Sequence, residues 1–141
     1  MLKIPGGKTM ENNLICPKCK GFLNIGGNII FSTRQKNGKT GLILLHEQFG
    51  NYTVTKHANY NYESGEHVSF FCPLCHAKLK SDAHENFATI QMIDKNNQVF
   101  NVYFSEIADE KSTFVLVGDN IEIYGKDSEP YINFFNLAQT L

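Results

Sequence analysis

Apolar and polar residues alternate along several short stretches of the chain. In the clearest stretch, at 98–105, Phe100, Val102 and Phe104 would share one face of an extended segment. Alternation with a period of two residues predicts a β-strand. The same reasoning predicts further strands at 28–34, 40–46, 52–56, 66–71, 87–93, 113–117 and 121–124.

Polar segments between these stretches predict tight turns. Asn37-Gly38 is typical of a two-residue hairpin turn, because both residue types tolerate a positive φ. Residues 94–97 and 118–120 are also rich in turn-forming residues, and each joins two predicted strands. The chain is therefore expected to fold mainly as antiparallel hairpins.

Helical structure is predicted in two places only. A short helical turn is predicted at 105–110, with Ser105 as its cap. A longer helix is predicted from about Glu129 to Ala138, after Asp127 or Ser128 as the capping residue. The second helix would lie at the end of the β-rich part of the chain.

The composition agrees with a folded, strand-rich protein. Of 141 residues, 42% are hydrophobic and 19% are charged, which is a globular composition. Eleven Phe and six Tyr favour strands. Nothing near the start resembles a secretory signal, and no apolar run approaches the roughly 20 residues that span a bilayer. We therefore expect a soluble, cytoplasmic protein, in which paired cysteines bind metal more readily than they form disulfides.

Two segments of the chain, 15–23 and 71–79, repeat one pattern. Each has an apolar residue, then Cys-Pro-x-Cys, and ends in a leucine four residues after the second cysteine. Proline presets φ after the first cysteine, and amides of such a turn can donate hydrogen bonds to the sulfurs. The four cysteines are Cys16, Cys19, Cys72 and Cys75.

Two such pairs meeting face to face predict one tetrahedral Zn²⁺ site, with a leucine of each segment packed beneath it. Iron fits the same four sulfurs, and two disulfides or free thiols are the non-metal alternatives. A site closed by four sulfurs has no open position for water or substrate. With no thiol left as a nucleophile, and with no sequence signature of a catalytic serine, a phosphate-binding loop or a metalloprotease, we expect a protein that is not an enzyme.

The two Cys-Pro-x-Cys segments resemble the zinc knuckles of the zinc-ribbon and rubredoxin-like superfamily. The resemblance covers residues 14–23 and 70–79 only. Family knuckles often have glycine after the second cysteine, where this chain has Lys20 and His76. The 52 residues between Cys19 and Cys72 also exceed what a minimal ribbon needs.

The resemblance suggests a division of the chain. Residues 1–13 are predicted to be a flexible leader, 14–82 a zinc-ribbon lobe with a β-hairpin insert, and 83–141 an acidic β-rich lobe that ends in the short helix. These two lobes either share one continuous domain or fold separately. In all cases the expected fold class is mostly β.

The histidines are not expected to bind the metal. His76 follows Cys75 directly, but four cysteines already complete the coordination shell. His46, His57, His67 and His84 lack the spacing of a metal-binding pair. Surface or interface roles are therefore predicted for these four, and His76 is expected beside the ligands or on the surface.

Charge is distributed unevenly along the chain. Residues 1–40 contain seven Lys and Arg but one acidic residue, whereas 81–141 contain three Lys and ten Asp and Glu. The basic segment, with Phe22, Phe31 and Arg34, could form a nucleic-acid-binding face, although the overall pI is near 6.5. Lysines beside the knuckles would also offset the charge of a four-thiolate site.

The segment 47–66 contains four aromatic residues among Asn and Gly: Phe49, Tyr52, Tyr60 and Tyr62. This composition suits a recognition surface. It equally suits a loop whose aromatic side chains pack onto a sheet.

The function expected from the sequence is a zinc-stabilised binding or adaptor module with a protein partner and no membrane association. A nucleic-acid-binding zinc ribbon and a rubredoxin-like iron electron carrier are the alternatives.

Overall fold

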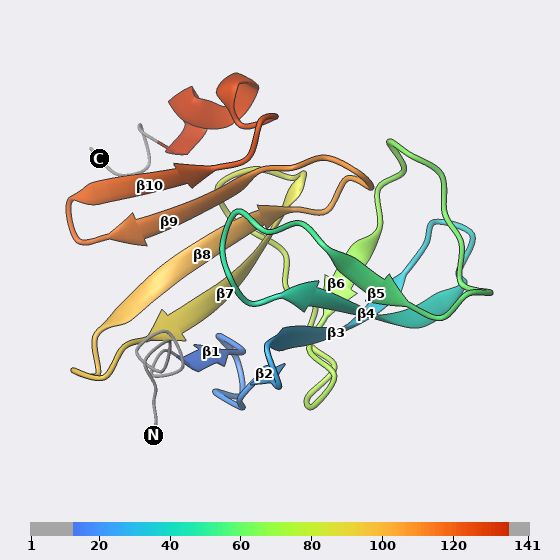
Figure 1. Ribbon diagram of the computed structural model, residues 1–141, viewed down its shortest axis with the longest axis horizontal. Coiled ribbons are helices and arrows are strands. Elements are labelled where there is room, and N and C mark those ends of the chain that lie inside the picture. The colour runs from blue at the N-terminus through green and yellow to red at the C-terminus, as the bar shows by residue number, and fades with distance from the viewer. Residues whose placement is uncertain (1–12, 136–141) are drawn as a thin grey trace.

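The computed structural model describes residues 13–135, which form two five-stranded antiparallel sheets (Figure 1). The first sheet has the order β1-β7-β8-β9-β10, with bounds Asn13–Ile15, Phe87–Ile93, Val99–Ser105, Thr113–Val117 and Asn120–Tyr124. The second has the order β2-β3-β4-β5, with bounds Asn24–Ile25, Asn28–Arg34, Thr40–His46 and Val54–Lys56. Its fifth strand, β6 (Ser69–Phe71), pairs with β3 on the side opposite β4. The mostly β fold class predicted from the alternation is thus confirmed.

The predicted hairpins are present, but the turn between β3 and β4 is longer than expected. The strands end with Arg34 opposite Thr40. The Gln35 amide then donates to the Lys39 carbonyl at 2.8 Å, and Gly38, at φ +91°, donates to the Gln35 carbonyl at 2.9 Å. This is a three-residue loop with glycine in the left-handed position, so the two-residue turn was wrong by one residue.

The two sheets pack face to face through one core. Alternate residues of β7 and β8 point toward the second sheet, among them Ala88, Ile90, Val102 and Phe104, all of which belong to this core. Phe104 lies 5.2 Å, between ring centroids, from both Phe31 of β3 and Phe70 of β6. The core therefore includes side chains from both sides of residue 82, where the lobe boundary is predicted.

The opposite face of the first sheet is covered by the C-terminal segment. A 3₁₀ turn at Glu129–Tyr131 leads into helical residues 132–135, and the rest of the predicted helix lies outside the described residues. Phe135 stacks on Phe114 of β9 at 4.1 Å between centroids and also contacts Phe87 of β7 at 5.1 Å. The C-terminal segment thus covers the part of this face around Phe87 and Phe114 (Figure 1).

Two local predictions about helix ends were wrong. Ser128 occupies the N-cap position, but its hydroxyl donates to the Tyr124 carbonyl at 2.7 Å and caps no helical amide. Residues 105–110 form a turn and not a helix, because Ile107 forms a β-bridge with His67. The Ser105 hydroxyl does accept a hydrogen bond from the Ile107 amide, at 3.1 Å, as serine does in such turns.

The aromatic side chains of 47–66 pack onto the protein. The Tyr60 ring is 5% exposed, and its hydroxyl contacts the Thr33 hydroxyl at 2.7 Å. Gly41 leaves room for it, since a Cβ there would come within 2.7 Å of the ring. Phe49 and Tyr52 reach across to the first sheet. Of the two expectations for this segment, packing onto the sheets is the one observed.

Residues 1–12 of the predicted leader lie outside the described residues, and Asn13 begins β1. Within 13–135, no helix has the length and apolarity needed to cross a bilayer.

Candidate metal centre

Each Cys-Pro-x-Cys segment lies where the chain passes from one sheet to the other. The first segment, 16–22, leads from β1 in the first sheet to β2 in the second. The second, 72–78, leads out of β6 in the second sheet toward β7 in the first, and Lys80 on this path already bridges to Ala88 of β7. The cysteines therefore gather at the edge where the two sheets join.

The backbone closes both knuckles in the same way. The Lys20 amide donates to the Cys16 carbonyl at 2.9 Å, and the Cys16 amide donates to the Gly21 carbonyl at 3.0 Å. The same two bonds recur in the second knuckle, from His76 to Cys72 at 2.9 Å and from Cys72 to Ala77 at 3.0 Å. The internal repeat seen in the sequence is thus a repeat of backbone geometry.

The residue after each second cysteine has a left-handed backbone. Lys20 has φ +65° and His76 has φ +69°. This conformation costs a residue with a Cβ about 1–2 kcal/mol and costs glycine almost nothing. The geometry therefore explains why glycine is common there in similar knuckles, and it shows that this chain tolerates the strain at both places.

Backbone amides of both knuckles point at the sulfurs. In the first, the amides of Lys18 and Cys19 lie 3.3 and 3.5 Å from Cys16 Sγ, and the Gly21 amide lies 3.4 Å from Cys19 Sγ. In the second, the amides of Leu74 and Cys75 lie 3.3 and 3.4 Å from Cys72 Sγ. Amide donors of this kind stabilise thiolates, which are the form of cysteine that binds metal.

The four sulfurs form a compact group. Cys16 Sγ lies 3.8 Å from Cys75 Sγ, and Cys19 Sγ lies 3.8 Å from Cys72 Sγ. All four Sγ atoms lie within 4.8 Å of one another, and none is in a disulfide. In a regular tetrahedron with Zn–S bonds of about 2.3 Å, neighbouring sulfurs are about 3.8 Å apart. The donor set and its spacing thus fit one tetrahedral metal ion.

The four thiols differ in burial and in their electrostatic surroundings. Cys16 and Cys72 are fully buried, whereas Cys19 and Cys75 are exposed. Burial raises the pKa of the Cys72 thiol to about 12. The Ala77 amide acts in the other direction and lowers the pKa of Cys75. Four thiolates so close together need a positive ion to offset their repulsion.

The leucines predicted to lie beneath the site are in place. Leu23 and Leu79 both belong to the main core and are 2% and 1% exposed. Their amides donate to the Leu14 and Phe70 carbonyls at 2.7 and 2.9 Å. Each knuckle is therefore anchored in the core by the leucine that follows it.

The histidines lie outside the sulfur cluster. His76 is exposed, and neither it nor any other histidine joins the cluster. His67 makes a contact that the sequence did not suggest: its Nε2 lies 2.8 Å from Glu106 Oε1. Glu106 also accepts the Phe70 amide, at 3.0 Å, on its other oxygen.

Glu106 is the buried carboxyl that sequence analysis missed. It is 3% exposed, and burial raises its pKa, while the hydrogen bond from His67 acts in the opposite direction. The two residues lie 39 positions apart in the chain, one before β6 and the other after β8, so no local pattern could have paired them. The one sequence signal was an ionisable residue directly after an alternating strand.

No family model matches the chain, and no curated protein or solved structure does either. What the structure shows is four cysteines in two Cys-x-x-Cys pairs that cluster as a potential metal site.

Proposed function

We propose that this protein is a non-enzymatic binding module in which Cys16, Cys19, Cys72 and Cys75 hold one structural Zn²⁺. The observation that carries the proposal is the closed group of four sulfurs at the edge where the chain crosses between the sheets. A metal ion there would join two chain segments that are far apart in the sequence, since Cys19 and Cys72 are 53 residues apart.

The coordination chemistry favours a structural ion over a catalytic one. Four cysteine sulfurs complete a tetrahedral shell, whereas catalytic zinc keeps one position for water. Within residues 13–135, this is the one group of three or more potential ligand residues whose donor atoms come together. The proposal of a protein without enzymatic activity rests on this closure.

A surface beside the metal supports a protein as the partner. Phe22 and Leu74, one from each knuckle, are 64% and 59% exposed. Leu74 reaches the other knuckle, since a Cβ on Gly21 would lie 2.5 Å from Leu74 Cδ1. We call Phe22 and Leu74 the knuckle patch. Large apolar side chains exposed together are typical of interaction sites.

The charges near the knuckle patch indicate what kind of segment would bind there. Four exposed lysines belong to the knuckles or flank them: Lys18, Lys20, Lys78 and Lys80. A protein segment with an apolar residue between Asp or Glu residues would complement this surface. This partner chemistry is part of the proposal.

Metal identity is tested by elemental analysis of the native protein, with thiols counted before and after chelation. One zinc per chain and four thiols exposed by chelation are expected. One iron per chain and a red protein would replace the proposal with an electron carrier. Four thiols that react fully before chelation would remove the metal site.

The partner is tested with Phe22→Glu and Leu74→Glu, compared with Leu42→Glu, which alters an equally exposed leucine on β4. The probe is a synthetic peptide with one leucine flanked by aspartates, and binding is measured by fluorescence anisotropy. Binding that is lost in both knuckle variants and kept in Leu42→Glu is expected. Equal binding by all three variants would contradict the knuckle patch.

Nucleic acid is the rival partner. The exposed Arg34, one of its candidate residues, lies over the Phe71 ring with its guanidinium 4.9 Å from the ring centroid. Binding of an oligonucleotide that weakens steeply with added salt would favour this rival.

A further inference from the structure

A cavity of about 330 Å³ lies between the two sheets. Its apolar walls come from both sheets and include Ile29, Ile43, Phe70, Ile90, Val102 and Phe104. No residue of β1 or β2 lines it, and Val54 and Lys56 of β5 do, so it lies away from the edge that carries the knuckles. Its size is at the lower end of the range of small-molecule sites, which are also mostly apolar.

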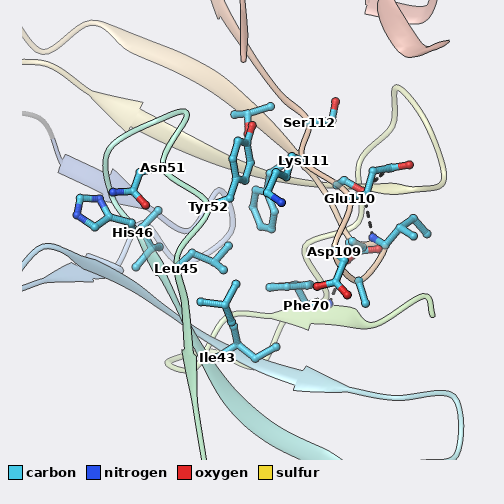
Figure 2. A pocket seen from close by; sticks show the side chains of 18 of the residues that line it. Ile43, Leu45, His46, Asn51, Tyr52, Phe70, Asp109, Glu110, Lys111 and Ser112 are labelled. Atoms are coloured by element: carbon cyan, nitrogen blue, oxygen red, sulfur yellow. Dashed lines mark hydrogen bonds between the residues drawn. The ribbon is translucent and has the colours of Figure 1, made fainter. Parts of the chain in front are cut away.

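The segment between β4 and β5 spans this cavity from one sheet to the other. The Phe49 ring lies 5.8 Å from the Tyr124 ring of β10, and the Tyr52 hydroxyl lies 2.9 Å from Thr113 Oγ1 of β9. Figure 2 shows Tyr52 between the two sides of the cavity, with Ile43 and Leu45 of β4 below it. These contacts link the sheets across the cavity.

Glu106 is the buried ionisable group in the lining. Each of its oxygens accepts one hydrogen bond, from His67 Nε2 and from the Phe70 amide, and a carboxylate oxygen can accept a second. Asp109 and Lys111 also belong to the lining, and the other two charged side chains there are engaged elsewhere. Lys56 Nζ donates to the Tyr60 carbonyl at 2.7 Å, and Glu110 accepts from Ser105 and Tyr131.

We propose that this cavity binds a small, mainly apolar molecule whose hydrogen-bond-donating head group, a hydroxyl or an amine, faces the Glu106 carboxyl. The apolar walls from both sheets would hold the body of the molecule. A head group that only accepts hydrogen bonds would face the Glu106 carboxylate, which is also an acceptor. It would lose its hydrogen bonds to water and gain none in return. A carboxylate would meet like charge as well. This site is separate from the metal and from the knuckle patch, so it goes beyond the proposed function.

The proposal is tested with four probes that share a phenyl ring and differ in head group: 2-phenylethanol, 2-phenylethylamine, phenylacetone and 3-phenylpropanoate. Binding to the zinc-loaded protein is followed by ¹H–¹⁵N NMR. Ligands of this size bind with a Kd of about 1 mM when they fit. We expect saturable shifts at cavity-lining amides for the alcohol and the amine, and at least tenfold weaker binding of the ketone and the carboxylate.

Two variants assign the site. Glu106→Gln is expected to remove the preference for donor head groups, whereas Glu85→Gln, at an exposed glutamate outside the lining, is expected to keep it. Val102→Leu places an extra methylene in the cavity and is expected to weaken the alcohol at least tenfold. Its control is Val115→Leu, because Val115 pairs with Val102, shares its core and does not line the cavity.

No saturable binding of any probe to the wild-type protein would overturn the proposal. Equal binding of all four probes would overturn the role of Glu106. Should Glu106→Gln fail to fold, the Val102→Leu and Val115→Leu pair still decides, and unchanged affinity in Val102→Leu would place the ligand elsewhere.

Discussion

The two edges of this β-sandwich are held together by different means. At the edge of β1, β7, β2 and β6, two backbone crossings bring four sulfurs to within 4.8 Å of one another. Toward the opposite edge, the sheets are linked by a ring contact and by the hydrogen bond from Tyr52 to Thr113, with a cavity beneath. At the first edge, this cluster of sulfurs is a potential metal site. At the second, weaker contacts leave room for a ligand.

The largest effect is expected at the metal edge. Cys16→Ser or Cys72→Ser should leave the protein largely unfolded, because zinc supplies on the order of 10 kcal/mol in small zinc domains. Circular dichroism and NMR dispersion would show the loss. Leu42→Ser, at an exposed site of β4, is the control and should fold normally. A folded Cys16→Ser protein with an unchanged Tm would contradict the structural role of the metal.

The next effect separates two leucines of the same knuckle. Leu79→Ala should lower the free energy of unfolding by about 2–5 kcal/mol, because Leu79 is 1% exposed and leaves a cavity in the core. Leu74→Ala should change it by less than about 0.5 kcal/mol, since Leu74 is 59% exposed. Denaturant unfolding at fixed zinc concentration measures both. Similar losses of unfolding free energy in the two variants would contradict the difference in burial between Leu79 and Leu74.

A smaller effect is expected at the edge that carries the cavity. Tyr52→Phe removes the hydrogen bond to Thr113 and should cost about 1 kcal/mol. Amide hydrogen exchange should become faster in 47–53 and stay unchanged in both knuckles. The control is Tyr62→Phe, because the Tyr62 hydroxyl has no hydrogen bond within 13–135. Exchange that accelerates equally at both edges would show that the edges are not independent.

A stabilising change is expected at the left-handed residues. His76→Gly should raise the free energy of unfolding by about 0.5–1 kcal/mol, because relief of the strained φ exceeds the entropy that glycine loses on folding. His76→Ala keeps the strain and should give no gain. A thermal melt of the zinc-loaded proteins compares them, and an equal Tm for both variants would argue against strain at this position.

The last expectation concerns pH. Burial raises the pKa of Glu106 above its ordinary value of 4.5, so the folded state binds this proton more tightly than the unfolded state. The contribution of Glu106 to stability is therefore largest below pH 4.5 and falls as pH rises through the higher pKa of the folded state. The difference in unfolding free energy between wild type and Glu106→Gln should shrink with rising pH. A difference that grows with pH would mean that folding lowers the pKa of Glu106 and does not raise it.

The sequence alone predicted eight of the ten strands and the four cysteines that cluster, because both depend on residues close together in the chain, but it missed β1 and β2. Alternation over seven residues was enough for β7 and β8, and two Cys-Pro-x-Cys repeats with their leucines were enough for the four sulfurs. Turn lengths and helix ends were predicted less accurately. The length of the loop closed by Gln35 and Lys39, and the hydrogen bond of the Ser128 hydroxyl, depend on which carbonyl groups lie nearby in the folded protein.

Only the tertiary structure decided how these pieces meet. It brought His67 to Glu106, folded Phe49 and Tyr52 across to the other sheet, and left a cavity between the walls. Each of these contacts joins residues that are far apart in the chain, and their free energy depends on sheet packing rather than on local conformational preference. The sequence named the residues at both edges, but the packing of the two sheets decided that one edge gathers the sulfurs and the other leaves a cavity.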